Sequence, residues 1–159
     1  TVVDKFGGAA GEKAKYFIAV NRLMSDRAAG ISELEGIAKT NTDVGKLAKF
    51  ALAQTRFDDG KYDEAATLYQ ELIALPDAVV AKETINFQLA KTFEKQSKTK
   101  EAADLYFTIA KTAAEAKDSD GKPVPMGETA NEAKEKLTAL DAERAKEIVV
   151  PTPESPFGN

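Results

Sequence analysis

An apolar pattern with helical spacing stops at a polar turn and then restarts, and this feature constrains the fold more than any other. Residues 52–75 read LAQTRFDDGKYDEAATLYQELIAL, with the turn at Asp58-Asp59-Gly60 and Pro76 directly after the second pattern. Apolar residues recur every three or four positions on both sides of the turn, which is typical of amphipathic helices. Proline ends a helix because it lacks an amide donor and disfavours the helical conformation of the preceding residue. The stretch therefore predicts two antiparallel helices, a helical hairpin.

The same plan occurs again on either side of this hairpin. Gly30, Ala65 and Ala102 are equivalent positions, spaced 35 and 37 residues apart. Glycine costs roughly 1 kcal/mol in a helix interior relative to alanine, so we interpret Gly30 as a residue that lets two helices approach closely. The apolar residues that carry this plan are Leu52, Ala53, Phe57, Ala65, Leu68, Tyr69, Leu72 and Ile73 in one of the two clearer hairpins, and Leu89, Ala90, Phe93, Ala102, Leu105, Tyr106 and Ile109 in the other.

The remaining helices follow from the same periodicity. A helix from about residue 12 carries a stripe that we expect to be half-buried, consisting of Tyr16, Phe17, Val20, Leu23 and Met24. Ser25-Asp26 ends it, and further helices are expected over about 27–39, 43–57, 61–75, 78–95, 98–117 and 127–147. Asn41, Thr42 or Asp43 is expected to cap the helix that begins near residue 43, and Asp77 the one that begins near residue 78.

The two ends of the chain differ from this pattern. Residues 1–8 resemble the last turn of an earlier helix or a linker, with Gly7-Gly8 as the expected helix end. Residues 148–159 contain three prolines and no periodicity, so we expect an extended tail. The helical domain is thus expected over 9–147, with repeats at about 11–44, 46–79 and 83–116 and a capping helix at about 127–147.

Composition excludes several classes of function. The chain of 159 residues has a net charge of -4, which disfavours a nucleic-acid partner because phosphate binding depends on Lys and Arg. It contains no His and no Cys, so imidazole bases, thiolate nucleophiles and the usual zinc ligands are absent. No carboxylate pair falls in an expected apolar pocket that would shift its pKa. We therefore expect no enzyme activity, no cofactor, no bound metal and no small-molecule substrate.

Two short motifs suggest ligand sites but fail on spacing. The segment GGAAGEKAK from Gly7 lacks the Gly-Lys-Ser/Thr ending of a phosphate-binding loop. The segment that begins at Asp118 and reaches Gly121 suggests a calcium loop, yet the matching ligand positions hold Ala116 and Gly127. Both are interpreted as ordinary polar segments, the second as a turn.

With the hairpins placed, the pattern resembles tetratricopeptide repeats, whose period is 34 residues. In the repeat at 46–79 the matching residues are Leu52, Ala53, Gly60, Tyr62, Ala65 and Tyr69. In the repeat at 83–116 Ser97 and Thr99 stand in place of the family's Gly and Tyr, and the repeat at 11–44 fits loosely. The resemblance implies an all-α fold, a right-handed α-α superhelix or solenoid of three helical hairpins with a C-terminal capping helix.

Within that family the chain resembles bacterial membrane-anchored members of the Sec-translocon ancillary subunit and cell-division coordinator type, which share a segment like EAKEKL, here Glu132 to Leu137. This resemblance implies an extracytoplasmic, periplasmic-side location and an N-terminal transmembrane helix that is absent from this chain; a cytoplasmic location stays open.

The resemblance also implies a non-enzymatic scaffold that binds a protein or peptide in a concave groove lined by the first helix of each hairpin. The groove positions are Phe50, Gln54, Phe57, Phe87 and Lys91, with Phe50 and Phe87 as an exposed aromatic pair. Aromatic residues at helical spacing are more often part of a core, so that interpretation stays open. A structural module that self-associates through its repeat ends is the second hypothesis.

Overall fold

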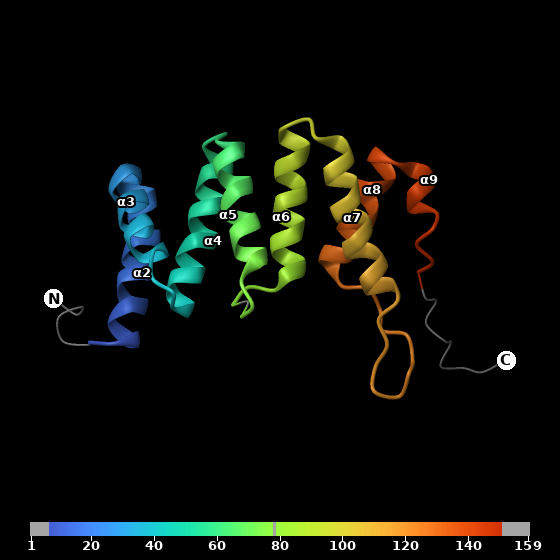
Figure 1. The fold of residues 1–159 in the computed structure, drawn as a ribbon, viewed down its shortest axis with the longest axis horizontal. Helices are drawn as coiled ribbons and strands as arrows, with labels where there is room; N and C mark the ends of the chain where they lie inside the picture. Colours follow the sequence, from blue (N-terminus) through green and yellow to red (C-terminus); the bar gives the residue numbers. More distant parts are fainter. Residues whose placement is uncertain (1–6, 78, 151–159) are drawn as a thin grey trace. The chain divides into compact units, whose positions relative to one another are not determined.

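The computed structural model describes residues 7–77 and 79–150, and every regular element within these residues is a helix (Figure 1). In chain order the helices are α2 (Ala9–Ser25), α3 (Arg27–Ala38), α4 (Asp43–Asp58), α5 (Tyr62–Ala74), α6 (Lys82–Lys95), α7 (Thr99–Ala114), α8 (Glu128–Leu140) and α9 (Ala142–Ala145). The chain divides into two compact units, Thr1–Ile85 and Asn86–Asn159, and the boundary falls inside α6. The all-α prediction is confirmed for the described residues.

The first unit is built from hairpins whose helices approach closely. Helix α2 packs against α3, α3 against α4 and α4 against α5. Ala19, Leu34 and Ala48 form its fully buried centre between α2, α3 and α4. A Cβ on Gly30 would lie 2.7 Å from the backbone nitrogen of Leu23 and 3.0 Å from the carbonyl oxygen of Ala19. The predicted role of Gly30, close approach of two helices, is therefore confirmed.

Polar contacts tie α4 to both of its neighbours in the first unit. The Thr42 hydroxyl accepts a hydrogen bond from the Gly45 amide at 3.1 Å, which confirms the expected N-cap of α4. Arg56, whose side chain is 12% exposed, donates to Glu35 of α3 at 2.6 Å and lies 3.0 Å from Glu64 of α5. One guanidinium group thus bridges three helices.

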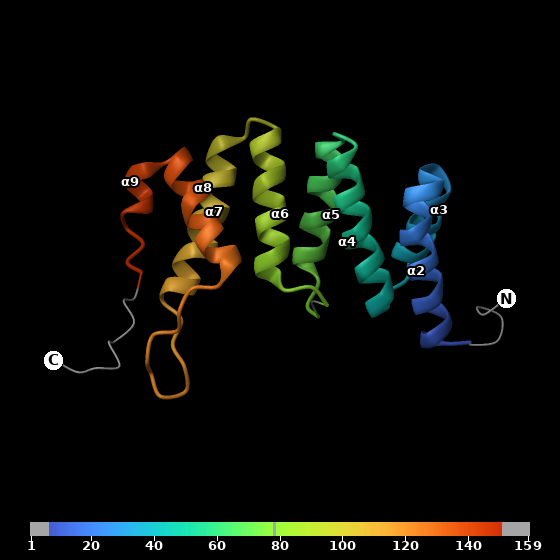
Figure 2. The same cartoon turned by 180° about the vertical axis from the view of Figure 1, so that it is seen from behind.

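The second unit has an apolar core shared by α6, α7, α8 and α9. Phe87 and Ala90 of α6 pack with Tyr106 of α7 and with Ala133 and Leu137 of α8. Helix α8 lies along α7, and α9 follows α8 (Figure 2). The loop at 115–127 projects beyond the end of α7 and returns to the core at the start of α8 (Figure 1).

The turn between α4 and α5 ends the first helix with a left-handed glycine. Gly60 has φ +74°. Its amide donates to the carbonyl of Phe57 at 3.0 Å, and the amide of Lys61 donates to Arg56 at 2.8 Å. This pair of hydrogen bonds is the Schellman motif, which satisfies carbonyl groups that the helix end leaves without partners.

The turn between α6 and α7 has the same geometry without a glycine. Ser97 has φ +60°, the only positive φ of a non-glycine residue in the described chain. Its amide donates to Glu94 at 3.0 Å, and the amide of Lys98 donates to Phe93 at 2.9 Å. Ser97 therefore occupies the position of Gly60, although a side chain is disfavoured in this conformation.

The expected single helix at 127–147 is wrong, because it breaks at Asp141 into α8 and α9. Asp141 has φ -151° and ψ 83°, and its side chain accepts a hydrogen bond from the Arg144 amide at 3.0 Å. An N-cap aspartate stabilises a new helix start and so competes with continuing the old helix.

Three further expectations near the ends of helices are corrected or fall outside the description. Helix α6 begins at Lys82, so Asp77 does not cap it. The expected extended tail at 148–159 stays a prediction: residues 148–150 follow α9 without regular secondary structure, and Ile148 is 4% exposed and belongs to the core of the second unit. The expected helical turn at residues 1–6 and the tail at 151–159 lie outside the described residues. Gly8, expected near a helix end, precedes the start of α2.

The loop after α7 is a turn, as the sequence predicts for 118–121. The carboxylate of Asp118 accepts hydrogen bonds from the amides of Asp120 and Lys122, both at 2.9 Å. Lys117 and Pro123 form an isolated antiparallel bridge below it, and Gly121 has φ +78°. The carboxylate is thus used by the turn itself.

Candidate protein-binding surface

The three expected groove residues of the first unit lie on one face of α4, four and three positions apart. The Phe50 ring packs edge-on against Tyr69, with 5.9 Å between the ring centroids, and the Phe57 ring packs similarly against Tyr62 at 5.4 Å. Both phenylalanines are half-buried, whereas Gln54 between them is exposed. Gln54 is therefore the group of this set that offers its polar atoms most openly.

The two expected groove residues of the second unit lie on α6. Phe87 is only 5% exposed and packs edge-on against Tyr106, with 5.6 Å between centroids. The ammonium group of Lys91 lies 5.8 Å from the Phe87 ring centroid. An exposed Phe50–Phe87 pair is thus not found, because Phe87 is part of the core and Phe50 leans on Tyr69. Both phenylalanines are covered because a tyrosine stands at the same place in the second helix of each hairpin, Tyr69 in α5 and Tyr106 in α7.

Gln54 and Lys91 occupy equivalent places, 37 residues apart, in the two clearer hairpins. Each follows its packed phenylalanine by four residues, so each lies one helical turn further along the same face. The structure brings Gln54 together with Phe50 and Phe57 on α4, and Lys91 together with Phe87 on α6. Of the five expected residues, these two have polar side chains; Gln54 is exposed, and Lys91 is half-buried with its ammonium over the Phe87 ring.

A buried hydroxyl in the second unit was not anticipated from the sequence. Tyr106 is fully buried, and its hydroxyl donates to the Glu94 carboxylate at 2.6 Å; that carboxylate also lies 3.5 Å from the Lys136 ammonium. Burial and the hydrogen bond to Glu94 together raise the pKa of Tyr106 above its usual range. One feature of the sequence could have indicated this polar contact: Glu94 stands at the position where the other hairpin has the apolar Phe57.

The expected half-buried stripe of α2 is partly wrong. Two members of the stripe are exposed, Phe17 at 60% and Met24 at 91%, and Ile18, which was not part of it, is 45% exposed. Tyr16, Val20 and Leu23, the other members of the stripe, pack on the core of the first unit, together with Ala19. The core side of α2 is therefore set by the alanine that meets Gly30, and two of the largest apolar residues face away from it.

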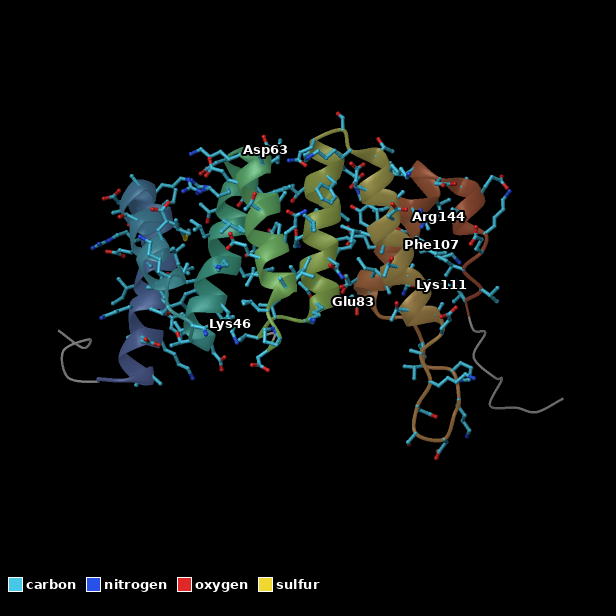
Figure 3. All side chains as sticks on the ribbon, viewed as in Figure 1. Lys46, Asp63, Glu83, Phe107, Lys111 and Arg144 are labelled. Atoms are coloured by element: carbon cyan, nitrogen blue, oxygen red, sulfur yellow. The ribbon has the colours of Figure 1, made fainter. Side chains whose placement is uncertain are left out.

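Two cationic side chains lie over the ring of Phe107 in α7, and one of them, Arg144, joins α9 to α7. The Arg144 guanidinium lies 4.3 Å from the Phe107 centroid and the Lys111 ammonium 5.3 Å from it (Figure 3). Arg144 also forms an ion pair with Asp104. Aromatic faces attract cations, and here the contact joins the last helix to its neighbour rather than leaving an open site.

Neither a metal centre nor a membrane-spanning helix occurs in the part of the chain that the structure describes. No cluster of three or more metal-ligating side chains forms there, and no helix is both long and apolar enough to cross a bilayer. Comparison with known protein families, curated proteins and solved structures finds no match.

Proposed function

We propose that the chain is a non-enzymatic protein-binding scaffold, a tetratricopeptide-like solenoid that presents equivalent polar positions of its first helices to a protein or peptide partner. The observation that carries the proposal is the duplication of one hairpin geometry with different polar residues. Phe50 stacks on Tyr69 as Phe87 stacks on Tyr106, while Gln54 is replaced by Lys91. Constant packing with varied surface chemistry is what repeat scaffolds use for recognition.

Gln54 and Lys91 would supply the recognition, and the phenylalanines beside them would hold the two helices in shape. Phe87 is core, so replacing it would unfold the surface as well as alter it. The test therefore changes the polar groups alone. The chain is immobilised and exposed to a bacterial envelope extract, and the retained proteins are compared between the native chain and a Gln54→Arg, Lys91→Glu variant.

A matched control is offered by exposed positions of the second helices, Gln70 and Lys100. The Gln70→Arg, Lys100→Glu variant carries the same change of charge elsewhere on the two units. We expect the control to retain the partners of the native chain and the Gln54, Lys91 variant to lose them. Identical partners in all three proteins would overturn the assignment of these two residues.

A self-associating module is the second candidate, and the exposed face of α2 favours it. Phe17 and Met24 are 60% and 91% exposed, and apolar exposure of this kind marks contact surfaces. The expected result is a solution mass that rises with concentration and falls to the monomer value in a Phe17→Ser, Met24→Ser variant. A monomer at high concentration would remove this candidate.

The location is proposed from the resemblance alone: an extracytoplasmic domain attached to the membrane by an upstream helix. Fractionation of the full-length gene product, with protease protection of the two membrane faces, tests it. Recovery in the cytoplasmic fraction would overturn the proposed location without affecting the scaffold.

A further inference from the structure

A hollow of about 470 Å³ opens on the first hairpin, between α2 and α3. Its apolar part is formed by Ile18 and Ile37, and Gly36 leaves space between them and the Lys15 side chain. A Cβ on Gly36 would meet nothing within 4 Å. Gly36 is therefore unlike Gly30, since no close approach within the described chain requires it.

The place equivalent to the hollow in the neighbouring hairpin, α4–α5, is found by aligning the first helices, α2 and α4. Gly11 and Gly45 are both buried, as are Ala19 and Ala53, and each pair is 34 residues apart. The same shift places Lys15 of α2 on Lys49 of α4.

The second helices align through two small buried residues. Gly30 of α3 matches Ala65 of α5, a shift of 35 residues that places Gly36 on Glu71. In the second hairpin the ammonium of Lys49 and the carboxylate of Glu71 form an ion pair at 2.7 Å. The first hairpin keeps the lysine and replaces the carboxylate with empty space.

In the part of the chain that the structure describes, Lys15 forms no ion pair like that of Lys49 with Glu71. Glu33, which also lines the hollow, is paired with Arg22. Glu12 lies one turn before Lys15 on α2 and forms no ion pair with it. Next to the ammonium, Ile18 is 45% exposed, whereas its equivalent Leu52 is 6% exposed. Within the described residues, the hollow therefore combines two charged groups that form no ion pair, Lys15 and Glu12, with the uncovered side chain of Ile18.

We propose that the hollow receives an amphipathic helical segment of a partner protein, which places a carboxylate over Gly36 to pair with Lys15 and an apolar side chain on Ile18 and Ile37. The partner supplies what Glu71 supplies to Lys49 within the chain. A second copy of the chain fits less well, because a two-fold contact centred on the hollow brings the two Lys15 ammonium groups face to face. The site is separate from Gln54 and Lys91, so its failure leaves the proposed scaffold surface untouched.

The probe is a peptide with the sequence of residues 62–75, which in a helix presents Glu71 on one face with Leu68 and Leu75, and its Glu71→Gln version is the matched control. Binding is followed by the methyl NMR signals of Ile18 and Ile37 in the full chain, and Leu52 reports any displacement of α5. We expect the glutamate peptide to shift the Ile18 and Ile37 signals and leave Leu52 in place. The glutamine peptide should bind about two- to fivefold more weakly, as loss of a solvated ion pair predicts.

Variants of the protein test the same contact from the other side. Lys15→Gln should weaken the glutamate peptide about two- to fivefold and leave the glutamine peptide unchanged, whereas Lys13→Gln, an exposed lysine that does not line the hollow, should change neither. Gly36→Glu should abolish the shifts because α3 then supplies the carboxylate itself.

Three results would overturn the proposal. They are equal binding of the two peptides, shifts that persist in Gly36→Glu, and Ile18 and Ile37 signals that shift with the concentration of the chain alone, which would show that a second copy covers the hollow. If Gly36→Glu lowers the thermal midpoint, the Lys15 and Lys13 variants decide alone.

Discussion

The hairpins α4–α5 and α6–α7 are one design used twice, with a shift of 37 residues. Phe50 on Tyr69 and Phe87 on Tyr106 have interplanar angles of 62° and 61°. Thr55 and Thr92 are both buried, and each hydroxyl donates to the carbonyl four residues earlier, at 2.8 and 2.7 Å. The packing residues are therefore kept along with the geometry that they produce.

The two hairpins differ where they approach the turn. The first has the aromatic pair Phe57 and Tyr62; the second has Glu94 and Thr99 at the same places. Glu94 then accepts a hydrogen bond from Tyr106, whereas Tyr69 makes no such bond to any residue that the structure describes. The same backbone arrangement therefore tolerates either an apolar or a polar side chain at the position of Phe57 and Glu94, provided that the tyrosine ring stays buried.

The largest expected effect tests whether the tyrosine ring is the common anchor. Tyr69 is 1% and Tyr106 0% exposed, so truncation of either leaves a large cavity. Tyr69→Ala and Tyr106→Ala should each lower the free energy of unfolding by about 3–5 kcal/mol. Urea denaturation followed by circular dichroism measures both, and exposed Gln70→Ala serves as the control. A cost below about 1 kcal/mol for either tyrosine would break the equivalence of the hairpins.

Sequence reasoning reached the helices and most of their boundaries because apolar period and turn chemistry are local signals. Gly60, Gly30 and Thr42 each act as expected. It missed the break at Asp141, where an apolar period continues across a capped helix start. It also assigned Met24 to a buried face. Apolar periodicity identifies a stripe on a helix, but it does not tell how much of that stripe the neighbouring helix covers.

The expected binding surface was less accessible to sequence reasoning than the fold. Phe50 and Phe87 were identified correctly as equivalent, yet their exposure depends on a ring from another helix. The hollow beside Gly36 lies where the neighbouring hairpin has Glu71, and only the structure shows that Glu71 pairs with Lys49 and that Gly36 borders an open space.

The polar difference between the hairpins gives the next largest effect. Tyr106→Phe removes the hydrogen bond to the Glu94 carboxylate and should cost about 1.5–3 kcal/mol, the range for bonds to charged groups. Tyr69→Phe should cost less than about 0.5 kcal/mol. The same denaturation experiment compares them. Equal costs would show that the Glu94 contact contributes nothing beyond the ring, and Glu94→Gln provides an independent check.

Alkaline pH should destabilise both hairpins through these tyrosines. Burial is the first cause that raises the pKa of Tyr69 and of Tyr106 above the ordinary 10.0. Above about pH 10 the unfolded chain therefore releases protons that the folded chain retains, and stability falls by up to about 1.4 kcal/mol per pH unit for each tyrosine. Each Tyr→Phe variant should flatten the fall between pH 10 and about 11.5 relative to the native chain. An unchanged slope in both variants would contradict the role of these hydroxyls.

The smallest expected effect exchanges the two turn residues. Gly60 and Ser97 have φ +74° and +60°, in matching Schellman turns. A side chain in this conformation costs about 1–2 kcal/mol, whereas glycine adopts it freely. Ser97→Gly should therefore raise the free energy of unfolding by about 1 kcal/mol, and Gly60→Ser should lower it by a similar amount.

The exchange is informative because the two changes are reciprocal. Glycine also increases the freedom of the unfolded chain, which offsets part of the gain at 97 and part of the loss at 60. Opposite signs would confirm that both turns need the left-handed conformation. If Ser97→Gly destabilises the second unit, the serine hydroxyl must contribute a contact that outweighs the backbone cost, and the two turns would be alike in geometry while differing in what stabilises them.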